Sequence, residues 1–287
     1  MARERCAFVA KETELREVQK TELELTKVFL EVCREHGLRC YADGGTLLGA
    51  VRHGGFIPWD DDMDFAMPRT DYDKLMEIGP QVFREPIFFQ SAYTDTDYVR
   101  PHVQLRTCGA LKDELMHAKF NQGIFIDIFP LDDVPTGRLC SFAQWAEVMF
   151  YKKLLAGLYM PMRRDAPALK KVAKKLLRRL RGKFDRKALY RRFEAACAKY
   201  EGKNDTFTLL SLYNEWHFRW LKKNWYAQTV EIQFEGGILP CPCGYENVLE
   251  IKYGDWKTEK KVETLHGQII FDVTESYQNI IEGGYYE

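Results

Sequence analysis

The sequence predicts an α/β (α+β) fold, in which a mixed sheet is flanked by helices and an additional helical region follows. Two patterns support this prediction. Short apolar runs of strand length alternate with segments of helical period in residues 1–137, and helical period dominates residues 138–235. The chain has 287 residues, of which 46% are hydrophobic, so it can bury a large core without disulfide or metal cross-links.

The individual elements follow from apolar spacing and from turn-forming residues. The first elements expected are a helix over 11–36 that is ended by Gly37, a strand over 38–42, a glycine turn at 44–46 and a short helix over 47–51. A loop over 52–59 should follow, and then a strand that starts in the next aspartates and ends at 65–67. Beyond it we expect a helix over 71–78 and strands over 99–106 and 123–129. Residues 1–137 are therefore predicted to form a core. A helical, basic and aromatic region at 138–235 and a C-terminal part at 236–287 that packs back on the core would follow.

Basic residues are unevenly distributed, although the formal net charge is zero. Residues 163–192 contain 14 Lys and Arg and two acids, a net charge of +12, which leaves 28 basic and 40 acidic residues elsewhere. Within this segment one apolar helical stripe lies opposite the basic residues; it consists of Leu169, Val172, Ala173, Leu176, Leu177 and Leu180. Such a helix suits an anionic membrane surface or a polyanionic partner, and the more common alternative is a solvated helix that packs its leucines on the core. We expect no nucleic-acid partner, because no other face has a basic excess.

The sequence also bears on location. No apolar stretch reaches the roughly 18 residues that span a bilayer, and the N-terminus lacks the apolar core of a secretory signal. The eight cysteines form no regular framework, and Cys241-Pro-Cys243 is a lone pair without a second pair to complete a zinc site. We therefore expect a cytoplasmic protein with reduced thiols, with peripheral contact at the inner face of the membrane through residues 163–192 as a further expectation.

The strongest chemical signal is the acidic segment Asp60-Asp61-Asp62-Met63-Asp64. If it is extended, Asp60, Asp62 and Asp64 share one face, because side chains alternate along a strand. Carboxylates this close repel one another and favour a cation that neutralises them. Oxygen ligands select Mg²⁺, Mn²⁺ or Ca²⁺ over zinc. The apolar residues that follow favour a strand over a calcium loop or an acid-rich helix start.

Two further sequence features suit a phosphate-binding and metal-binding site next to these aspartates. Gly44-Gly45-Thr46 lies between a predicted strand and a predicted helix, where glycines let the backbone approach a phosphate at the helix N-terminus. Asp127 is the single acid of an apolar strand, so its burial requires a partner. That partner is either a metal shared with Asp62 and Asp64 or a structural cation such as an arginine.

These segments resemble the hallmarks of the LicD family of phosphocholine transferases, which is part of the nucleotidyltransferase superfamily and related to the fukutin-type transferases. GGTLLGAVRHGGFIPWDDDMDFAM (residues 44–67) is similar to the first hallmark, FIDIFPLDDVP (125–135) to the second and YGDW (253–256) to the C-terminal one. The likeness spans about residues 11–266 and implies a nucleotidyltransferase-like catalytic core over 1–137. After YGDW the chain reads KTEKKVETLH where the family usually has prolines, so no role is assigned to His266.

The resemblance implies transfer of a phospho-alcohol group, phosphocholine in the first place, from CDP-choline or another CDP-alcohol to a hydroxyl of a sugar or lipid-linked glycan, with release of CMP. It implies Mg²⁺, or Mn²⁺ in its place, as the cofactor. The motif match assigns the metal to Asp60, Asp62, Asp64 and Asp127, the catalytic role to Asp62, Asp64 and Asp127, and the donor phosphates to Gly44, Gly45 and Thr46. Asp127, beside the metal, would also accept the proton of the acceptor hydroxyl.

Residues outside the matched carboxylates and glycines are further candidates. Arg52 and His53, between the glycines and the aspartates, are expected either to contact phosphates or to lie in a solvated loop, and Arg106 is a weaker candidate. A choline group requires an aromatic enclosure, although ordinary core packing is the simpler explanation for aromatic residues. The aromatic run that could supply it consists of Tyr213, Trp216, Trp220, Trp225 and Tyr226.

Two other functions stay open. A true nucleotidyltransferase would attack the α-phosphate of a nucleoside triphosphate and release pyrophosphate. A non-catalytic protein that binds a membrane or polyanion through its basic helix would tolerate Asp64→Asn.

Overall fold

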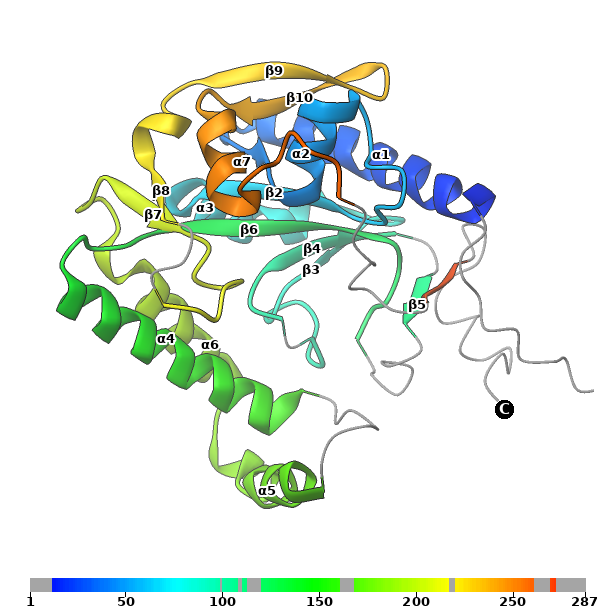
Figure 1. Cartoon of the computed structure of the whole chain (residues 1–287). Helices are drawn as coiled ribbons and strands as arrows, with labels where there is room; N and C mark the ends of the chain where they lie inside the picture. The colour runs from blue at the N-terminus through cyan, green and yellow to red at the C-terminus, as the bar shows by residue number, and fades with distance from the viewer. Residues whose placement is uncertain are drawn as a thin grey trace, which may run out of the picture.

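The computed structural model describes residues 12–98, 100–107, 110–112, 120–160, 168–216, 220–260 and 269–271. At its centre is a mixed sheet with the strand order β1-β2-β6-β4-β3, and β7 and β8 continue it from the far end of β6 (Figure 1). These strands are β1 (Tyr41–Ala42), β2 (Met63–Pro68), β3 (Phe88–Gln90), β4 (Val103–Arg106), β6 (Phe125–Asp133), β7 (Thr206–Thr208) and β8 (Leu221–Lys222). β2 and β6 run parallel, whereas the other neighbours in this sheet are antiparallel.

Helices flank this sheet on both sides, which confirms the predicted fold class. They are α1 (Glu12–Glu35), α2 (Gly44–His53), α3 (Arg69–Val82), α4 (Arg138–Tyr159), α5 (Ala168–Arg178), α6 (Arg186–Cys197) and α7 (Tyr245–Tyr253), with 3-10 helices at Arg181–Lys183, Ala198–Tyr200 and Lys223–Tyr226. In Figure 1, α1, α2 and α7 lie above β6, and α4, α5 and α6 lie below it. Two antiparallel strand pairs complete the described chain: the hairpin of β9 (Thr229–Phe234) and β10 (Gly237–Pro242), and β5 (Ala110–Lys112) with the distant β11 (Ile269–Phe271). None of the helices in the described ranges is both long and apolar enough to cross a bilayer.

Two large clusters make up most of the hydrophobic core of the described residues, and Tyr98 with Phe120 forms a small separate one. The larger one joins α1 to the sheet, for example through Phe29 and Phe65, whose ring centroids are 5.1 Å apart. The smaller cluster lies between α4 and α6 and includes Val148 and Phe193. Because side chains alternate along β2, the burial of Met63, Phe65 and Met67 on one face turns Asp64 to the other. The core therefore decides on which face of the sheet the Asp64 carboxylate lies.

Several predicted boundaries near the aspartates differ from the structure. The glycines at 44 and 45 form the first turn of α2 instead of a turn before it, and α2 continues to His53 instead of ending at residue 51. The strand predicted to begin in the aspartates begins at Met63, so residues 60–62 form a loop. The predicted helix that ends at Gly37 is confirmed, since α1 ends at Glu35 and Gly37 has a φ of +62°.

The second half of the predicted helical stretch also differs. α4, α5 and α6 occupy its first part, but from Thr206 onward the described chain forms β7, β8 and β9 and turns. Trp216 and Trp220 lie four residues apart, which suggested a helix, yet Trp216 is in a turn just before β8. Aromatic residues pack equally well in strands and loops, so their spacing alone was a weak indicator of helix.

The tip of the β9–β10 hairpin is fastened to the chain near the end of α2. The Phe56 amide donates to the Glu235 carboxylate over 3.3 Å, and the Glu235 amide donates to the Gly54 carbonyl over 2.9 Å. Arg16 of α1 forms an ion pair with the same carboxylate. A Cβ atom at Gly55 would overlap that carboxylate, so a larger residue there would displace the Glu235 side chain. We call this set of contacts the Glu235 clamp.

Candidate active site

Two carboxylates face each other across the parallel strands β2 and β6. Asp64 is the register partner of Asp127, and paired residues of neighbouring strands project to the same face of a sheet. Partial burial raises the pKa of Asp64, and the charges of Asp62 and then Asp127 raise it further. The single acid of the apolar strand thus lies beside the acidic segment, as the sequence predicts.

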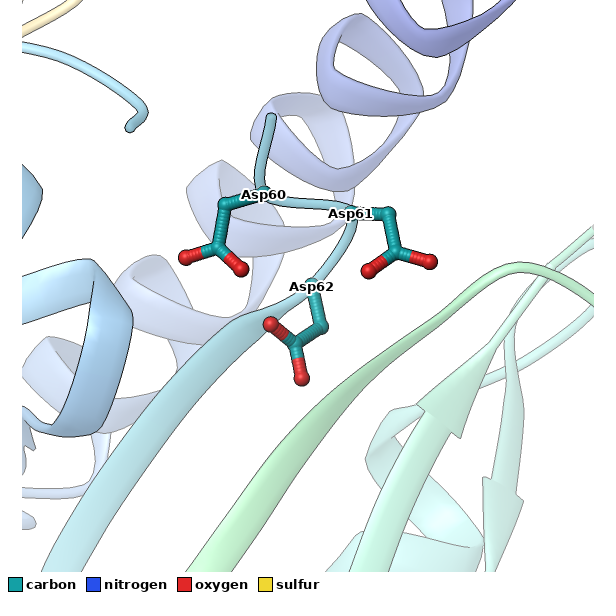
Figure 2. Close-up of side chains that lie close together, drawn as sticks. All are labelled: Asp60, Asp61 and Asp62. Carbon is teal, nitrogen blue, oxygen red and sulfur yellow. The ribbon is translucent and has the colours of Figure 1, made fainter. Parts of the chain in front are cut away.

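The loop before β2 gathers three more carboxylates. One side-chain oxygen from each of Asp60, Asp61 and Asp62 lies within 4.8 Å of the others. Figure 2 shows the three side chains fanning out from the loop, with one oxygen of each turned toward the others. The extended-strand prediction placed Asp61 on the opposite face; this detail is wrong, because a loop does not alternate its side chains as a strand does.

Helix α2 begins directly against these aspartates. A Cβ atom at Gly44, whose φ is +52°, would overlap the Asp64 carboxylate, and one at Gly45 would overlap that of Asp60. The Asp64 amide donates to Thr46 Oγ1 over 2.8 Å. Gly44 and Gly45 therefore let the carboxylates of Asp64 and Asp60 approach the start of α2, and they leave room for the backbone to approach a ligand as well.

A buried ion pair stabilises the residue before α2. Lys252 of α7 donates to both carboxylate oxygens of Asp43, and both side chains are nearly inaccessible to solvent. Asp43 therefore makes no side-chain cap for α2, so its carboxylate does not occupy the first-turn N–H groups of this helix. Sequence reasoning missed Lys252, although it directly precedes Tyr253 of the YGDW segment.

A buried polar stripe on α1 lies behind the aspartate loop. Gln19 Nε2 donates to the Asp60 carbonyl over 3.0 Å, and Thr26 Oγ1 donates to the Met63 sulfur over 3.3 Å. Between them, Glu22 is only 1% exposed, and its Oε2 has no hydrogen-bond partner among the described residues. Burial raises the pKa of Glu22, and the charges of the Asp60–Asp62 loop and Asp64 raise it further. An acid in this position is stabilised when a cation lies among the aspartates.

Donors surround Asp127 instead. Its Oδ1 accepts from Gln104 and lies 3.1 Å from His102 Nε2, and its Oδ2 lies 4.0 Å from Arg100 Nη1. Burial alone would raise the pKa of Asp127, but His102, Arg100 and Gln104 together hold it below its usual value. A carboxylate with a low pKa is a weak proton acceptor. This environment favours Asp127 as a metal ligand over the additional role of general base.

The three basic candidates lie away from the carboxylate cluster or support it indirectly. Arg52 and His53 are in the last turn of α2, nine or so residues and about 13 Å along the helix from its glycine start. Arg52 donates to the Trp256 carbonyl over 3.3 Å, and His53 is exposed. Arg106 is buried and donates to Gln104, the residue that holds Asp127. Arg52 and His53 therefore lie at the opposite end of α2 from the glycines, because this helix is longer than predicted.

Three of the five predicted cage aromatics line one small pocket. Tyr213, Trp216 and Trp220 share it with Trp145 of α4, and Glu215 adds a carboxylate. Trp225 and Tyr226 belong to the main core. Tyr213 also acts on the buried ion pair beside α2: burial lowers the pKa of Lys252, but Asp43 and then Tyr213 raise it above its usual value.

Facing carboxylates on parallel strands, with a glycine-led helix against them, define a nucleotidyltransferase-type domain. Residues 37–160 match the family described as "LicD/FKTN/FKRP, nucleotidyltransferase domain". Over 250 residues the chain is 25% identical to lipopolysaccharide cholinephosphotransferase LicD of Haemophilus influenzae, which covers 86% of this chain and 92% of that protein. Residues 37–160 thus resemble the LicD-type domain, and the chain is similar over most of its length to a LicD cholinephosphotransferase, which supports a transferase as its general class.

Other relatives match shorter parts. Ribitol 5-phosphate transferase FKRP of Homo sapiens is 43% identical over 55 residues, which is 19% of this chain and 11% of that protein. Uncharacterized protein RP689 of Rickettsia prowazekii is 34% identical over 113 residues, 39% of each chain.

Proposed function

We propose that the protein is a Mg²⁺-dependent phosphotransferase that moves a phospho-alcohol group from a CDP-linked donor to a glycan hydroxyl and releases CMP. Phosphocholine from CDP-choline is the first candidate. The observation that carries the proposal is the convergence of Asp64 and Asp127 with the Asp60–Asp62 loop at the start of α2. The named activities of the relatives, a cholinephosphotransferase and a ribitol 5-phosphate transferase, support the kind of group transferred.

The donor set fits a hard divalent cation. Its ligand atoms are carboxylate oxygens, the kind that Mg²⁺ and Mn²⁺ prefer. Behind the loop, the pKa of Glu22 is raised by burial and then by the charges of the aspartates, which supports a negative potential at this place that a cation would lower. Asp62, Asp64 and Asp127 would hold the ion, with Asp60 beside them. When bound, it would neutralise the charge that develops on the transferred phosphoryl group and on the leaving CMP.

The remaining residues position the donor. Backbone N–H groups at Gly44 and Gly45 would contact its phosphates at the N-terminus of α2, where the helix dipole favours anions. The pocket of Trp145, Tyr213, Trp216 and Trp220 would enclose a quaternary ammonium, and the Glu215 carboxylate would add charge attraction. The acceptor is a sugar or lipid-linked glycan hydroxyl, in keeping with the lipopolysaccharide in the name of the Haemophilus relative. A cytoplasmic location stays a prediction.

The test is release of CMP from a panel of CDP-alcohols with Mg²⁺, with and without a chelator. We expect release only with the metal, and loss of release in Asp64→Asn but not in the control Glu31→Gln, which changes an exposed acid of α1. Full release by Asp64→Asn would show that the assigned site is wrong. Release of pyrophosphate from a nucleoside triphosphate would support the nucleotidyltransferase alternative.

The aromatic pocket is tested separately. Trp220→Ala should weaken binding of CDP-choline more than binding of CDP-glycerol, because the glycerol group has no cation for the rings to attract. An equal effect on both donors would remove the pocket from the donor site.

A further inference from the structure

Helix α5 is an amphipathic helix that is only partly covered by the rest of the described chain. It lies at the bottom of Figure 1, near the C-terminal end of α4 and away from the sheet. Its contact with α4 is tight at one point: a Cβ atom at Gly157 would overlap a methyl group of Leu177. Leu177 belongs to the smaller hydrophobic cluster, so one edge of the apolar stripe of α5 packs on the protein.

The other edge of this stripe is exposed. Val172 is 65% and Leu176 62% exposed, and Leu180 just after the helix is 40% exposed. At about 100° per residue, Val172 and Leu176 lie roughly 100–140° around the helix from Leu177, so the contact with α4 does not reach them. Solvated helices normally bury such residues, and a half-covered stripe indicates a further partner.

Helix α4 extends the same apolar surface. Phe150 is 60% exposed and lies seven residues, or two turns, before Gly157, so it shares the face of α4 on which α5 packs. An exposed phenylalanine about two turns along this face of α4 from the α5 contact enlarges the apolar area available to one partner.

Basic side chains border this area. Lys175 and Arg179 are exposed and lie next to the Val172–Leu176 edge on the helix circumference. Residues 163–192 as a whole carry a net charge of +12. A second copy of this chain would bring an equal positive charge against the surface, and a nucleic acid would leave its leucine and valine side chains in water.

We propose that the exposed edge of α5, together with Phe150, binds the surface of an anionic lipid bilayer. Apolar side chains would enter the boundary between headgroups and acyl chains, and Lys175 and Arg179 would contact lipid phosphates. This binding is independent of the proposed chemistry. For an enzyme with a lipid-linked acceptor it would confine the search for the acceptor to the membrane plane.

The experiment is sedimentation of the full chain with phosphatidylcholine vesicles that contain or lack phosphatidylglycerol. We expect binding only to the anionic vesicles, weakened by added salt. Each basic side chain at a bilayer surface contributes about fivefold, so K175Q/R179Q should weaken binding about 25-fold. V172S/L176S should weaken it about tenfold or more while CMP release from a soluble donor stays unchanged.

The control K20Q/K27Q removes two exposed lysines from α1 and should bind as the unaltered protein does. Equal binding of all variants, or no binding to anionic vesicles, would overturn the proposal. So would a dimer in light scattering that V172S/L176S converts to a monomer, because a second copy would then cover this surface. Loss of CMP release in the proposed-function assay, with vesicle binding intact, would leave this inference standing and reject the chemistry alone.

Discussion

The two paired strands β2 and β6 hold carboxylates in opposite surroundings. Around Asp64 the nearest charges are other carboxylates, which raise its pKa, whereas around Asp127 the neighbours are His102, Gln104 and Arg100, which lower its pKa. The same pair of strands thus holds one carboxylate whose charge its neighbours disfavour and one whose charge they stabilise. Under the proposed function, a bound metal ion should change the environment of Asp64 more than that of Asp127.

The largest expected effect comes from Asp64, the carboxylate whose pKa its neighbours raise. Asp64→Asn should lower the rate of CMP release at least about 100-fold, because an electrostatic contact to the reacting group is lost. In a thermal melt, Mg²⁺ should raise the midpoint of the unaltered protein and leave that of the variant nearly unchanged. A variant that Mg²⁺ stabilises as well as the unaltered protein would contradict the assignment.

A smaller effect is expected from the glycine that lets Asp64 approach α2. Gly44→Ala should lower kcat/KM about 30-fold, since the new methyl group overlaps the carboxylate and displaces it from Asp127. Gly37→Ala is the matched control. Gly37 also has a positive φ, but its Cβ position is open, so the backbone strain is similar and the activity should stay unchanged.

Asp64 and Asp127 should differ most clearly in their contributions to the stability of the metal-free protein at pH 7. Asp127→Asn should lower the free energy of unfolding by about 2 kcal/mol, because His102, Gln104 and Arg100 would no longer face the negative charge that they stabilise. Asp64→Asn should raise it by about 1 kcal/mol, because repulsion is removed. Urea unfolding with a chelator present measures both changes. Two changes of the same sign would contradict the proposed difference between the strands.

The pH dependence of these changes follows from the direction of each pKa shift. The pKa of Asp127 is lowered in the folded state, so its stabilisation is present above its unfolded pKa near 3.9 and is lost as the pH falls through the lower folded value. The pKa of Asp64 is raised, so its unfavourable contribution is present above the raised value and disappears below about pH 3.9. Both substitutions should therefore matter little in strong acid.

The smallest effect concerns Glu22. Glu22→Gln should weaken Mg²⁺ binding about fivefold, measured by titration calorimetry, and slightly stabilise the metal-free protein, because one buried acid near the cluster is neutralised. Unchanged metal affinity would show that the charge of Glu22 does not interact with the bound ion. The control Glu24→Gln alters an exposed acid of the same helix.

The sequence predicts the parts of this site that depend on local pattern. Alternation in β2 and the apolar run of β6 are strong signals, so the pairing of Asp64 with Asp127 could be anticipated. Tertiary packing alone brings three other residues to the carboxylates, namely Glu22, Gln104 and Lys252. Their spacing along the chain does not predict this. Arg52 and His53 were predicted to lie in a loop and instead form the last turn of α2, since nothing local shows that this helix continues past residue 51.

The Glu235 clamp has a consequence for how small a working piece of this protein can be. The segment matched by the family model ends at residue 160, but the hairpin tip that fastens α2, the lysine that neutralises Asp43 and the acid behind the aspartate loop all lie outside it. A fragment cut to the matched segment would keep every recognisable carboxylate and lose the parts that hold them in register. We therefore expect a fragment to keep the site intact only if it also contains the residues before 37 and after 160.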